Sequence, residues 1–78
     1  MEGDAGGAPG AQACNADAAR SAVGKTATPE VVEQARRASG AAVARVLHPG
    51  EVVTMEYRAD RLNLEVDAGN VVLSVRCG

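Results

Sequence analysis

The chain contains a single aromatic side chain, Tyr57, and has neither phenylalanine nor tryptophan. Aromatic rings bury the largest apolar areas in most protein cores. The core of this chain must therefore be built from valine, leucine and alanine, which bury less area per residue. At 78 residues the sequence has room for one domain, and a domain of this size buries only a modest share of its surface. We expect a small fold of modest stability.

The charge of the chain does not favour nucleic acids or membranes as partners. The formal net charge is −2 at pH 7, and residues 24–78 carry seven basic and seven acidic residues, so no basic patch is available to neutralise phosphates. A single aromatic ring provides no stacking platform for bases. The longest apolar run is too short to cross a bilayer. We expect no nucleic-acid partner and no membrane partner.

The N-terminal part differs in composition from the rest of the chain. Residues 1–23 are rich in glycine and alanine and have no strong apolar stripe, so we expect a disordered or weakly ordered tail before a domain at 24–78. The first residues have neither the basic start nor the apolar stretch of a signal peptide. The expected location is the cytoplasm, or the extracellular space or vacuole if a leader was removed.

The cysteines and the histidine do not form a recognisable chemical motif. Cys14 and Cys77 lie near opposite ends, and His48 is the only histidine. This spacing matches no zinc site, so we expect no metal and no cofactor. A nucleophilic cysteine would need His48 beside it, and we expect no catalytic residues and no enzyme activity. Since no leader is visible, we expect two free thiols, with one disulfide joining the ends as the alternative.

One segment carries clear helix signals at both ends. Thr28 can cap a helix with its hydroxyl, and Pro29 suits the first helical position. Gly40 suits the position just after a helix, where the backbone often becomes left-handed. The sequence TPEVVEQARRASG between these signals predicts a helix over 29–39.

Three segments predict strands. The run at 41–48 is nearly all apolar and rich in valine, which is typical of a strand covered on both faces. Residues 61–67 alternate strictly between apolar and polar, and the turn sequence DAGN connects them to a partner strand at 71–76. The expected fold is α/β (α+β): one helix packed on a small mixed sheet. The first two strands should be parallel neighbours, and the third antiparallel beside the second.

The segment between the first two strands has the composition of an exposed loop. Residues 50–60 include β-branched residues that favour extended backbone, and Met55 is a flexible apolar side chain that fits a hydrophobic pocket. Such a segment suits the cleft of a serine protease, and stiffness lowers the entropy lost on binding. If the loop arches back over the sheet, Arg61 can donate charge-assisted hydrogen bonds to Glu56 and Thr54.

The sequence VVTMEYRADRLNLEVD resembles the reactive-site loop and following strand of the potato inhibitor I family, most closely the cereal subtilisin–chymotrypsin inhibitors. The similarity runs upstream through VLHPG and covers roughly residues 24–76. The resemblance implies substrate-like, reversible inhibition of serine proteases, with Met55–Glu56 as the reactive bond. It also implies that the protease contacts the residues around this bond, namely Val53, Thr54, Tyr57 and Arg58.

The same resemblance also implies which residues support the loop from beneath. Arg61 matches one of two arginines that brace the loop in that family, and Asn63 stands at the place of the second. Because Met55 is apolar, the expected partners are subtilisin-like and chymotrypsin-like proteases, bound by a monomer. The implied role is plant-type defence, including the wounding response. The alternative is a non-inhibitory interaction or storage protein on the same scaffold, whose weakly braced loop is cut as a substrate.

Exchange of Met55 for lysine tests the assignment of the primary specificity residue. The Met55→Lys variant should inhibit trypsin, which accepts a positive charge in its primary pocket, and should lose inhibition of enzymes with an apolar pocket. Titration of both enzyme types with wild type and variant measures the change. An unaltered inhibition profile would assign the pocket to another residue.

Overall fold

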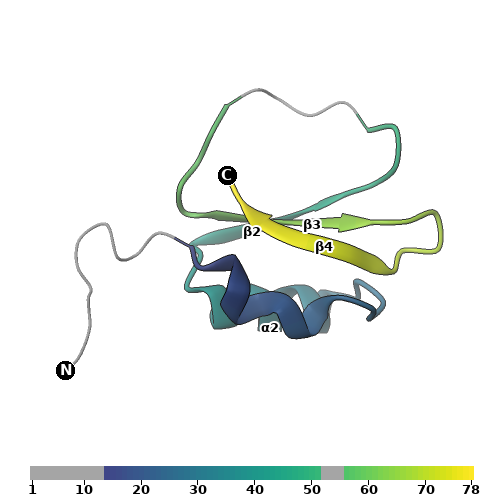
Figure 1. The fold of residues 1–78 in the computed structure, drawn as a ribbon, viewed down its shortest axis with the longest axis horizontal. Helices are drawn as coiled ribbons and strands as arrows, with labels where there is room; N and C mark the ends of the chain where they lie inside the picture. The colour runs from purple at the N-terminus through teal and green to yellow at the C-terminus, as the bar shows by residue number, and fades with distance from the viewer. Residues whose placement is uncertain (1–13, 52–55) are drawn as a thin grey trace.

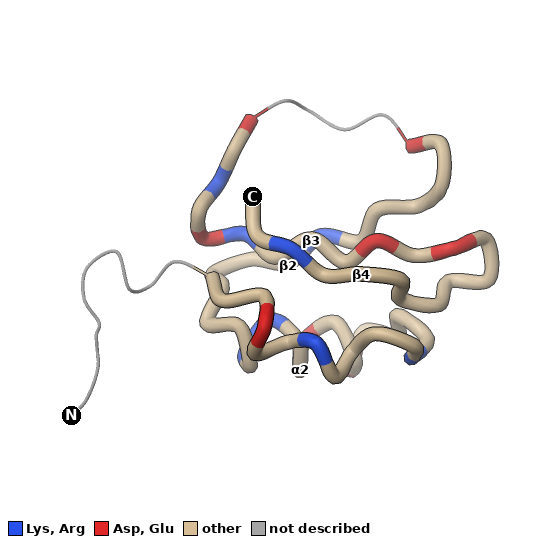
Figure 2. Tube along the Cα trace, viewed as in Figure 1, with Lys and Arg blue, Asp and Glu red and all other residues tan. Residues whose placement is uncertain are grey.

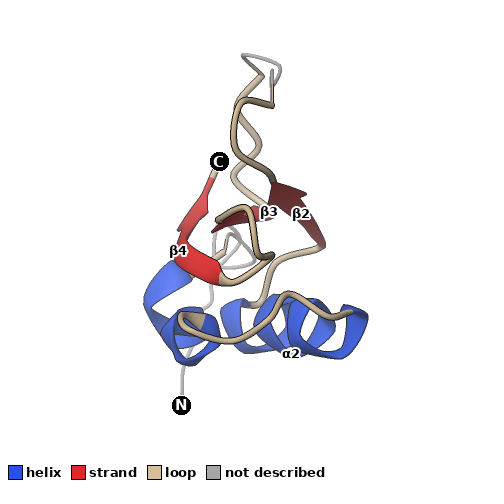
Figure 3. Ribbon diagram, turned by 90° about the vertical axis from the view of Figure 1, so that its right-hand side faces the viewer, coloured by secondary structure: helices blue, strands red, loops and turns tan. Residues whose placement is uncertain are grey.

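The computed structural model of the protein describes residues 14–51 and 56–78. Its elements, in chain order, are the 3-10 helix η1 (Ala16–Ala22), the α-helix α2 (Pro29–Ser39), and the strands β2 (Val43–Leu47), β3 (Arg61–Val66) and β4 (Val72–Cys77). Both helices cover one face of the sheet, and the connection from β2 to β3 rises from the opposite face (Figure 1, Figure 3). Neither helix has the length and apolar content that a membrane crossing requires. The expected α+β class is confirmed.

Helix α2 begins and ends where the sequence signals predict. The hydroxyl oxygen of Thr28 accepts a hydrogen bond of 3.2 Å from the main-chain N of Val31, which satisfies one of the free amides of the first turn. Gly40 follows the helix with left-handed backbone (φ 77°). Since both ends are set by local chemistry, the predicted boundaries 29–39 are confirmed.

The sheet has the predicted mixed topology. Its strand order is β2-β3-β4, with β2 parallel to β3 and β3 antiparallel to β4. The hairpin turn between β3 and β4 is closed by Asp67, whose Oδ1 accepts from the main-chain N of Gly69 (2.8 Å) and Val71 (3.0 Å). The expectation that the first strand is covered on both faces was wrong. β2 lies at the edge of the sheet, and apart from Leu47 its residues are only half-buried.

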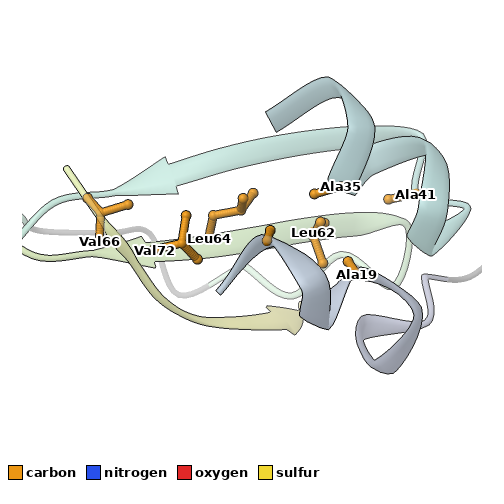
Figure 4. Packing of buried hydrophobic residues seen from close by; sticks show 8 residues of the cluster. Ala19, Ala35, Ala41, Leu62, Leu64, Val66 and Val72 are labelled. Atoms are coloured by element: carbon orange, nitrogen blue, oxygen red, sulfur yellow. The ribbon is translucent and has the colours of Figure 1, made fainter. Parts of the chain in front are cut away.

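The core consists of small aliphatic side chains, as the composition requires. Leu62 and Leu64 of β3 are fully buried, and they project among alanines contributed by both helices (Figure 4). Alanine lets the helices approach the sheet closely, so a dense interior forms without rings. The remaining buried apolar members of this cluster are Ala19, Ala22, Ala35, Ala41, Val66 and Val72.

The packed domain begins earlier in the chain than the sequence predicts. Residues 14–23, expected within a tail, include η1, and its Ala19 and Ala22 are 0% and 5% exposed. The side chain of Asn15 caps this helix by accepting from the main-chain N of Asp17 at 3.2 Å. Alanine gives little hydrophobic signal in a sequence, although it packs well in the narrow space beside the sheet. The packed domain therefore includes residues 14–23, which precede the domain boundary expected at residue 24.

A disulfide joins Cys14 to Cys77, with 5.8 Å between their Cα atoms. The expectation of two free thiols was therefore wrong. The end of β4 lies beside the start of η1, although Cys14 and Cys77 are separated by 63 residues in the sequence. The main-chain N of Cys14 also donates to the carbonyl oxygen of Ala59 at 3.0 Å, so the disulfide lies at the base of the β2–β3 connection.

Removal of this disulfide should lower the free energy of unfolding by about 2–5 kcal/mol, because the unfolded chain regains the entropy of an open loop. The Cys14→Ser/Cys77→Ser double variant and wild type would be compared by urea denaturation. Wild type under reducing conditions is the matched control and should behave like the variant. Equal midpoints for oxidised wild type and the double variant would show that the bond contributes nothing.

Candidate functional site

The candidate site is the connection from β2 to β3, whose two described arms stand away from the sheet on the side opposite the helices (Figure 3). The leading arm is 48–51, and the trailing arm is 56–60. Three predicted site residues, Val53, Thr54 and Met55, lie outside the described residues. In the trailing arm the side chains of Glu56, Tyr57 and Arg58 are exposed.

The leading arm is closed into a compact turn. Glu51 Oε1 accepts a hydrogen bond of 2.7 Å from the main-chain N of His48, and the main-chain N of Glu51 donates back to the His48 carbonyl oxygen at 3.1 Å. Gly50 supplies the positive φ of 75° that the turn needs. The hydrogen bond from the His48 main chain is the main reason why the pKa of Glu51 is lowered. The carboxylate therefore stabilises this turn in its ionised form.

The trailing arm is held by a bidentate ion pair and by the main chain. Arg58 donates from Nε to Asp60 Oδ1 and from Nη2 to Asp60 Oδ2, both at 2.9 Å. The side-chain hydrogen bond from Arg58 is the main reason why the pKa of Asp60 is lowered. The carbonyl oxygen of Asp60 accepts from the main-chain N of Ala42 at 2.8 Å. Arg58 therefore stiffens the base of the arm.

Arg61 lies beneath the arms with only 8% of its surface exposed. Its Nη2 donates to the main-chain carbonyl oxygen of Glu56 at 2.8 Å, and its Nε donates to the carbonyl oxygen of Gly78 at 2.8 Å. The sequence predicts a bond from Arg61 to Glu56, and in the structure the acceptor belongs to the main chain. The predicted second bond, to Thr54, lies outside the described residues.

Asn63 is 1% exposed and is placed next to Arg61 on the outer face of β3. Its Nδ2 donates to the carbonyl oxygens of Gly78 (3.0 Å) and Arg76 (3.4 Å), and its Oδ1 accepts from Arg45 Nε at 2.9 Å. Each of these contacts goes to the sheet or to Gly78, not to the described arms. Asn63 therefore supports the loop indirectly, through the group that Arg61 also binds.

Gly78 is bonded to the residues beneath the loop through both its main-chain N and its oxygen, although no sequence pattern indicates this role. Its main-chain N donates to the Arg61 carbonyl oxygen at 2.9 Å, and its oxygen accepts from Arg61 and Asn63. We call Arg61, Asn63 and Gly78 the bracing region. A Cβ atom placed on Gly78 would lie 3.2 and 3.3 Å from two ring carbons of Tyr57, which shows that the ring rests against the glycine. Tyr57 nevertheless remains 73% exposed, so its ring is available to a partner.

Each of the three strands carries basic residues, drawn blue in Figure 2. The strand register places Arg45 and Arg76 on either side of Asn63, on the same face of the sheet as Arg61. Arg76 is engaged by Glu65, with 2.9 Å from Nη2 to Oε2. Among these three arginines, Arg61 is the one that donates to main-chain carbonyls, those of Glu56 and Gly78, and such charge-assisted bonds suit the holding of a loop. In the described ranges, acidic, cysteine and histidine side chains form no group that could hold a metal ion.

Comparison with known proteins identifies the family of the chain. The model of the peptidase inhibitor I78 family matches residues 14–78, and the chain belongs to this family. The match begins at Cys14 and includes both cysteines, η1 and the complete sheet.

The relatives share a segment of sequence with this chain, and one of them also shares its fold. The elastase inhibitor AFLEI of Aspergillus flavus is 54% identical over 33 residues, which are 42% of this chain and 48% of that protein. The elastase inhibitor AFUEI of Aspergillus fumigatus is also 54% identical over 33 residues, 42% of this chain and 38% of that protein. The chain thus aligns with less than half the length of these curated relatives. A solved structure of elastase inhibitor AFUEI has a TM-score of 0.60 and 38% identity, covering 73% of this chain and 78% of that chain.

The family assignment corrects the resemblance to the potato inhibitor I family. That resemblance covers roughly residues 24–76 but is carried mainly by the loop and the strand after it, and a loop shaped to fit a protease cleft can occur on different scaffolds. The I78 match extends over residues 14–78 and includes the N-terminal helix and disulfide that the resemblance leaves out. The implied plant-defence and wounding roles lose their support with it, since the relatives are proteins of Aspergillus.

Exchange of Arg58 for glutamine should raise the pKa of the Asp60 carboxyl toward the ordinary aspartate value, because the bidentate pair is lost. Since the pair lowers this pKa in the folded state, its stabilising effect is present above the ordinary pKa of aspartate. The effect disappears as the pH falls through the lowered value. NMR titration of the Asp60 carboxyl carbon measures the change.

The matched control for this titration is Arg76→Gln on the outer face. The pKa of Glu65 is lowered by the Ser74 hydroxyl and then by Arg76, so this variant should raise the pKa of Glu65 and leave that of Asp60 unchanged. An Asp60 titration that is identical in wild type and Arg58→Gln would mean that the pair does not persist in solution.

Proposed function

We propose that the protein is a substrate-like, reversible inhibitor of serine proteases that presents the loop 50–60, with Met55–Glu56 as the reactive bond. Membership of a peptidase inhibitor family supports the class of activity. The observation that carries the proposal is the hydrogen bond from Arg61 Nη2 to the Glu56 carbonyl oxygen. It anchors the residue that directly follows the proposed reactive bond.

This anchor explains how cleavage would be suppressed. When a protease attacks the Met55 carbonyl, the amine of Glu56 is the leaving group. Arg61 holds Glu56 by its carbonyl oxygen, so the amine stays beside the acyl group and the bond re-forms before water replaces it. Because Arg61 is itself held by the Gly78 carbonyl, Arg61 and Glu56 lose little conformational entropy on binding.

The flanking residues would provide the rest of the contact surface. Val53 and Thr54 precede the proposed specificity residue in the sequence, and Tyr57 and Arg58 follow the proposed reactive bond. Tyr57 presents an exposed ring, and aromatic side chains are enriched in protein interfaces. Arg58 is already fixed by Asp60, so it would meet the protease in a defined position.

An elastase is the first target to consider. The relatives with sequence similarity are named elastase inhibitors. The primary pocket of an elastase is small and apolar, that of chymotrypsin is a hydrophobic slot, and that of trypsin binds a positive charge. Met55 is unbranched and flexible, so it can enter a narrow apolar pocket. Chymotrypsin-like and subtilisin-like enzymes are further proposed targets, and trypsin is excluded by the same argument.

The disulfide favours a different location from the cytoplasmic one expected from the sequence. Bonds such as Cys14–Cys77 persist in oxidising environments and are rare in the reducing cytosol. We therefore place the inhibitor outside the cytosol, where secreted proteases also act. It would work as a monomer without a cofactor, because the proposed loop needs no group beyond the chain itself.

Titration of an elastase, chymotrypsin and subtilisin with wild type and Arg61→Ala tests the proposal. Wild type should inhibit with one molecule per active site and remain inhibitory after hours. Arg61→Ala should be cut after Met55, so that its inhibition fades, since Glu56 is no longer anchored. Reducing gels and mass spectrometry locate the cut.

A charge-matched control, Arg37→Ala on the solvent side of α2, should behave like wild type. Steady cleavage of wild type at the same rate as Arg61→Ala would favour the non-inhibitory alternative, an ordinary substrate loop. Absence of both inhibition and cleavage would refute the loop assignment.

A further inference from the structure

The amide of Asn63 is buried, and each of its two polar atoms has a partner of fixed type. Its Nδ2 donates to the carbonyl oxygens of Gly78 and Arg76, which can only accept. Its Oδ1 accepts from Arg45 Nε, and a guanidinium can only donate. The acceptors on one side of the amide and the donor on the other therefore fix which end carries the nitrogen and which the oxygen. Arg45 is the partner that requires the Asn63 oxygen to face β2.

The strand register brings Arg45 to this position. In the parallel pairing of β2 with β3, Arg45 is the direct Cα partner of Asn63. On the other side, Arg76 of β4 is the antiparallel partner of Asn63, but its guanidinium binds Glu65 at 2.9 Å and 3.0 Å. Of the two arginines that flank Asn63, Arg45 is the one that donates to its side chain.

The contacts continue from Asn63 to the trailing arm. Asn63 Nδ2 and Arg61 Nε donate to the same atom, the carbonyl oxygen of Gly78, at 3.0 Å and 2.8 Å. The other end of the Arg61 guanidinium donates to the Glu56 carbonyl oxygen. Because guanidinium is planar and rigid, the position of the shared acceptor also sets the position of the donor that reaches Glu56.

We propose that Arg45 is a positioning residue for the reactive loop, which acts through Asn63 and the Gly78 carbonyl on Arg61. The second cation of the bracing region thus comes from the neighbouring strand, and Asn63 transmits its effect. This inference rests on the proposed function of the loop. It assigns a role to an arginine whose neighbours in the sequence, AAVARVLH, predict only a buried strand.

The test compares Arg45→Ala with Arg76→Ala, a matched control that removes the same charge from the same face. Two readouts are used: cleavage of the Met55–Glu56 bond by an elastase, and NMR signals of Arg61 Nε–H and the Asn63 side-chain amide without protease. Arg45→Ala should accelerate cleavage about tenfold, the size of one net hydrogen bond, and should shift both signals. Arg76→Ala keeps the main-chain carbonyl that accepts from Asn63, and it should leave the rate of cleavage and the Arg61 Nε–H signal unchanged.

A double-mutant cycle decides whether Arg45 acts through Asn63. In an Asn63→Ala background, Arg45→Ala should have no further effect on cleavage, because the connection is already broken. If Asn63→Ala does not fold, Asn63→Asp replaces it: the carboxylate still accepts from Arg45 but cannot donate to Gly78. That variant should also shift the Arg61 Nε–H signal, and addition of Arg45→Ala should not accelerate cleavage further.

Additive effects in the cycle, or an Arg45→Ala variant that loses stability without a shift of the Arg61 signal, would overturn the proposal. The NMR readout needs no protease, so it separates this inference from the proposed function. If wild type inhibits none of the enzymes, the proposed function fails, and the Arg61 and Asn63 signals still show whether Arg45 positions them.

Discussion

The guanidinium of Arg61 is the group on which the arrangement of the outer face depends. A cation with 8% exposure is tolerated only when its donors meet acceptors, since burial of an unpaired charge is costly. Its acceptors are the carbonyl oxygens of Glu56 and Gly78. The trailing arm and the end of the chain must therefore remain where the guanidinium needs them. Cys77, fixed to Cys14, holds the residue next to Gly78 in place.

The two faces of the sheet use different physical means. The helix side is held by burial of small aliphatic groups such as Leu62 and Leu64, an interaction without direction. The outer side is held by hydrogen bonds of defined geometry from Arg61 and Asn63 to main-chain oxygens. An apolar surface could bury the same area there but could not determine where Glu56 lies. The outer face therefore fixes the position of Glu56, and the inner face provides most of the stabilisation of the fold.

The parts of the fold that local chemistry determines were predictable from sequence. Thr28, Pro29 and Gly40 fix α2, and the alternation at 61–67 separates the buried leucines from the residues beneath the loop. The bond from Arg61 to Glu56 was also expected, although not its main-chain acceptor. Helix η1 was not predicted, because alanine carries no pattern. The disulfide was only the alternative to two free thiols, because pairing of Cys14 with Cys77 is decided in the folded chain. The role of Arg45 depends on the strand register, which the sequence alone does not provide.

The position of the disulfide has a consequence for the fate of a cleaved molecule. A cut between Met55 and Glu56 separates residues 1–55 from 56–78, and Cys14 and Cys77 lie on opposite sides of that cut. The two polypeptides would remain one covalent particle, joined further by the pairing of β2 with β3. The new chain ends would then meet at the high effective concentration of an intramolecular reaction. Resealing of the peptide bond becomes a first-order event, independent of how dilute the inhibitor is.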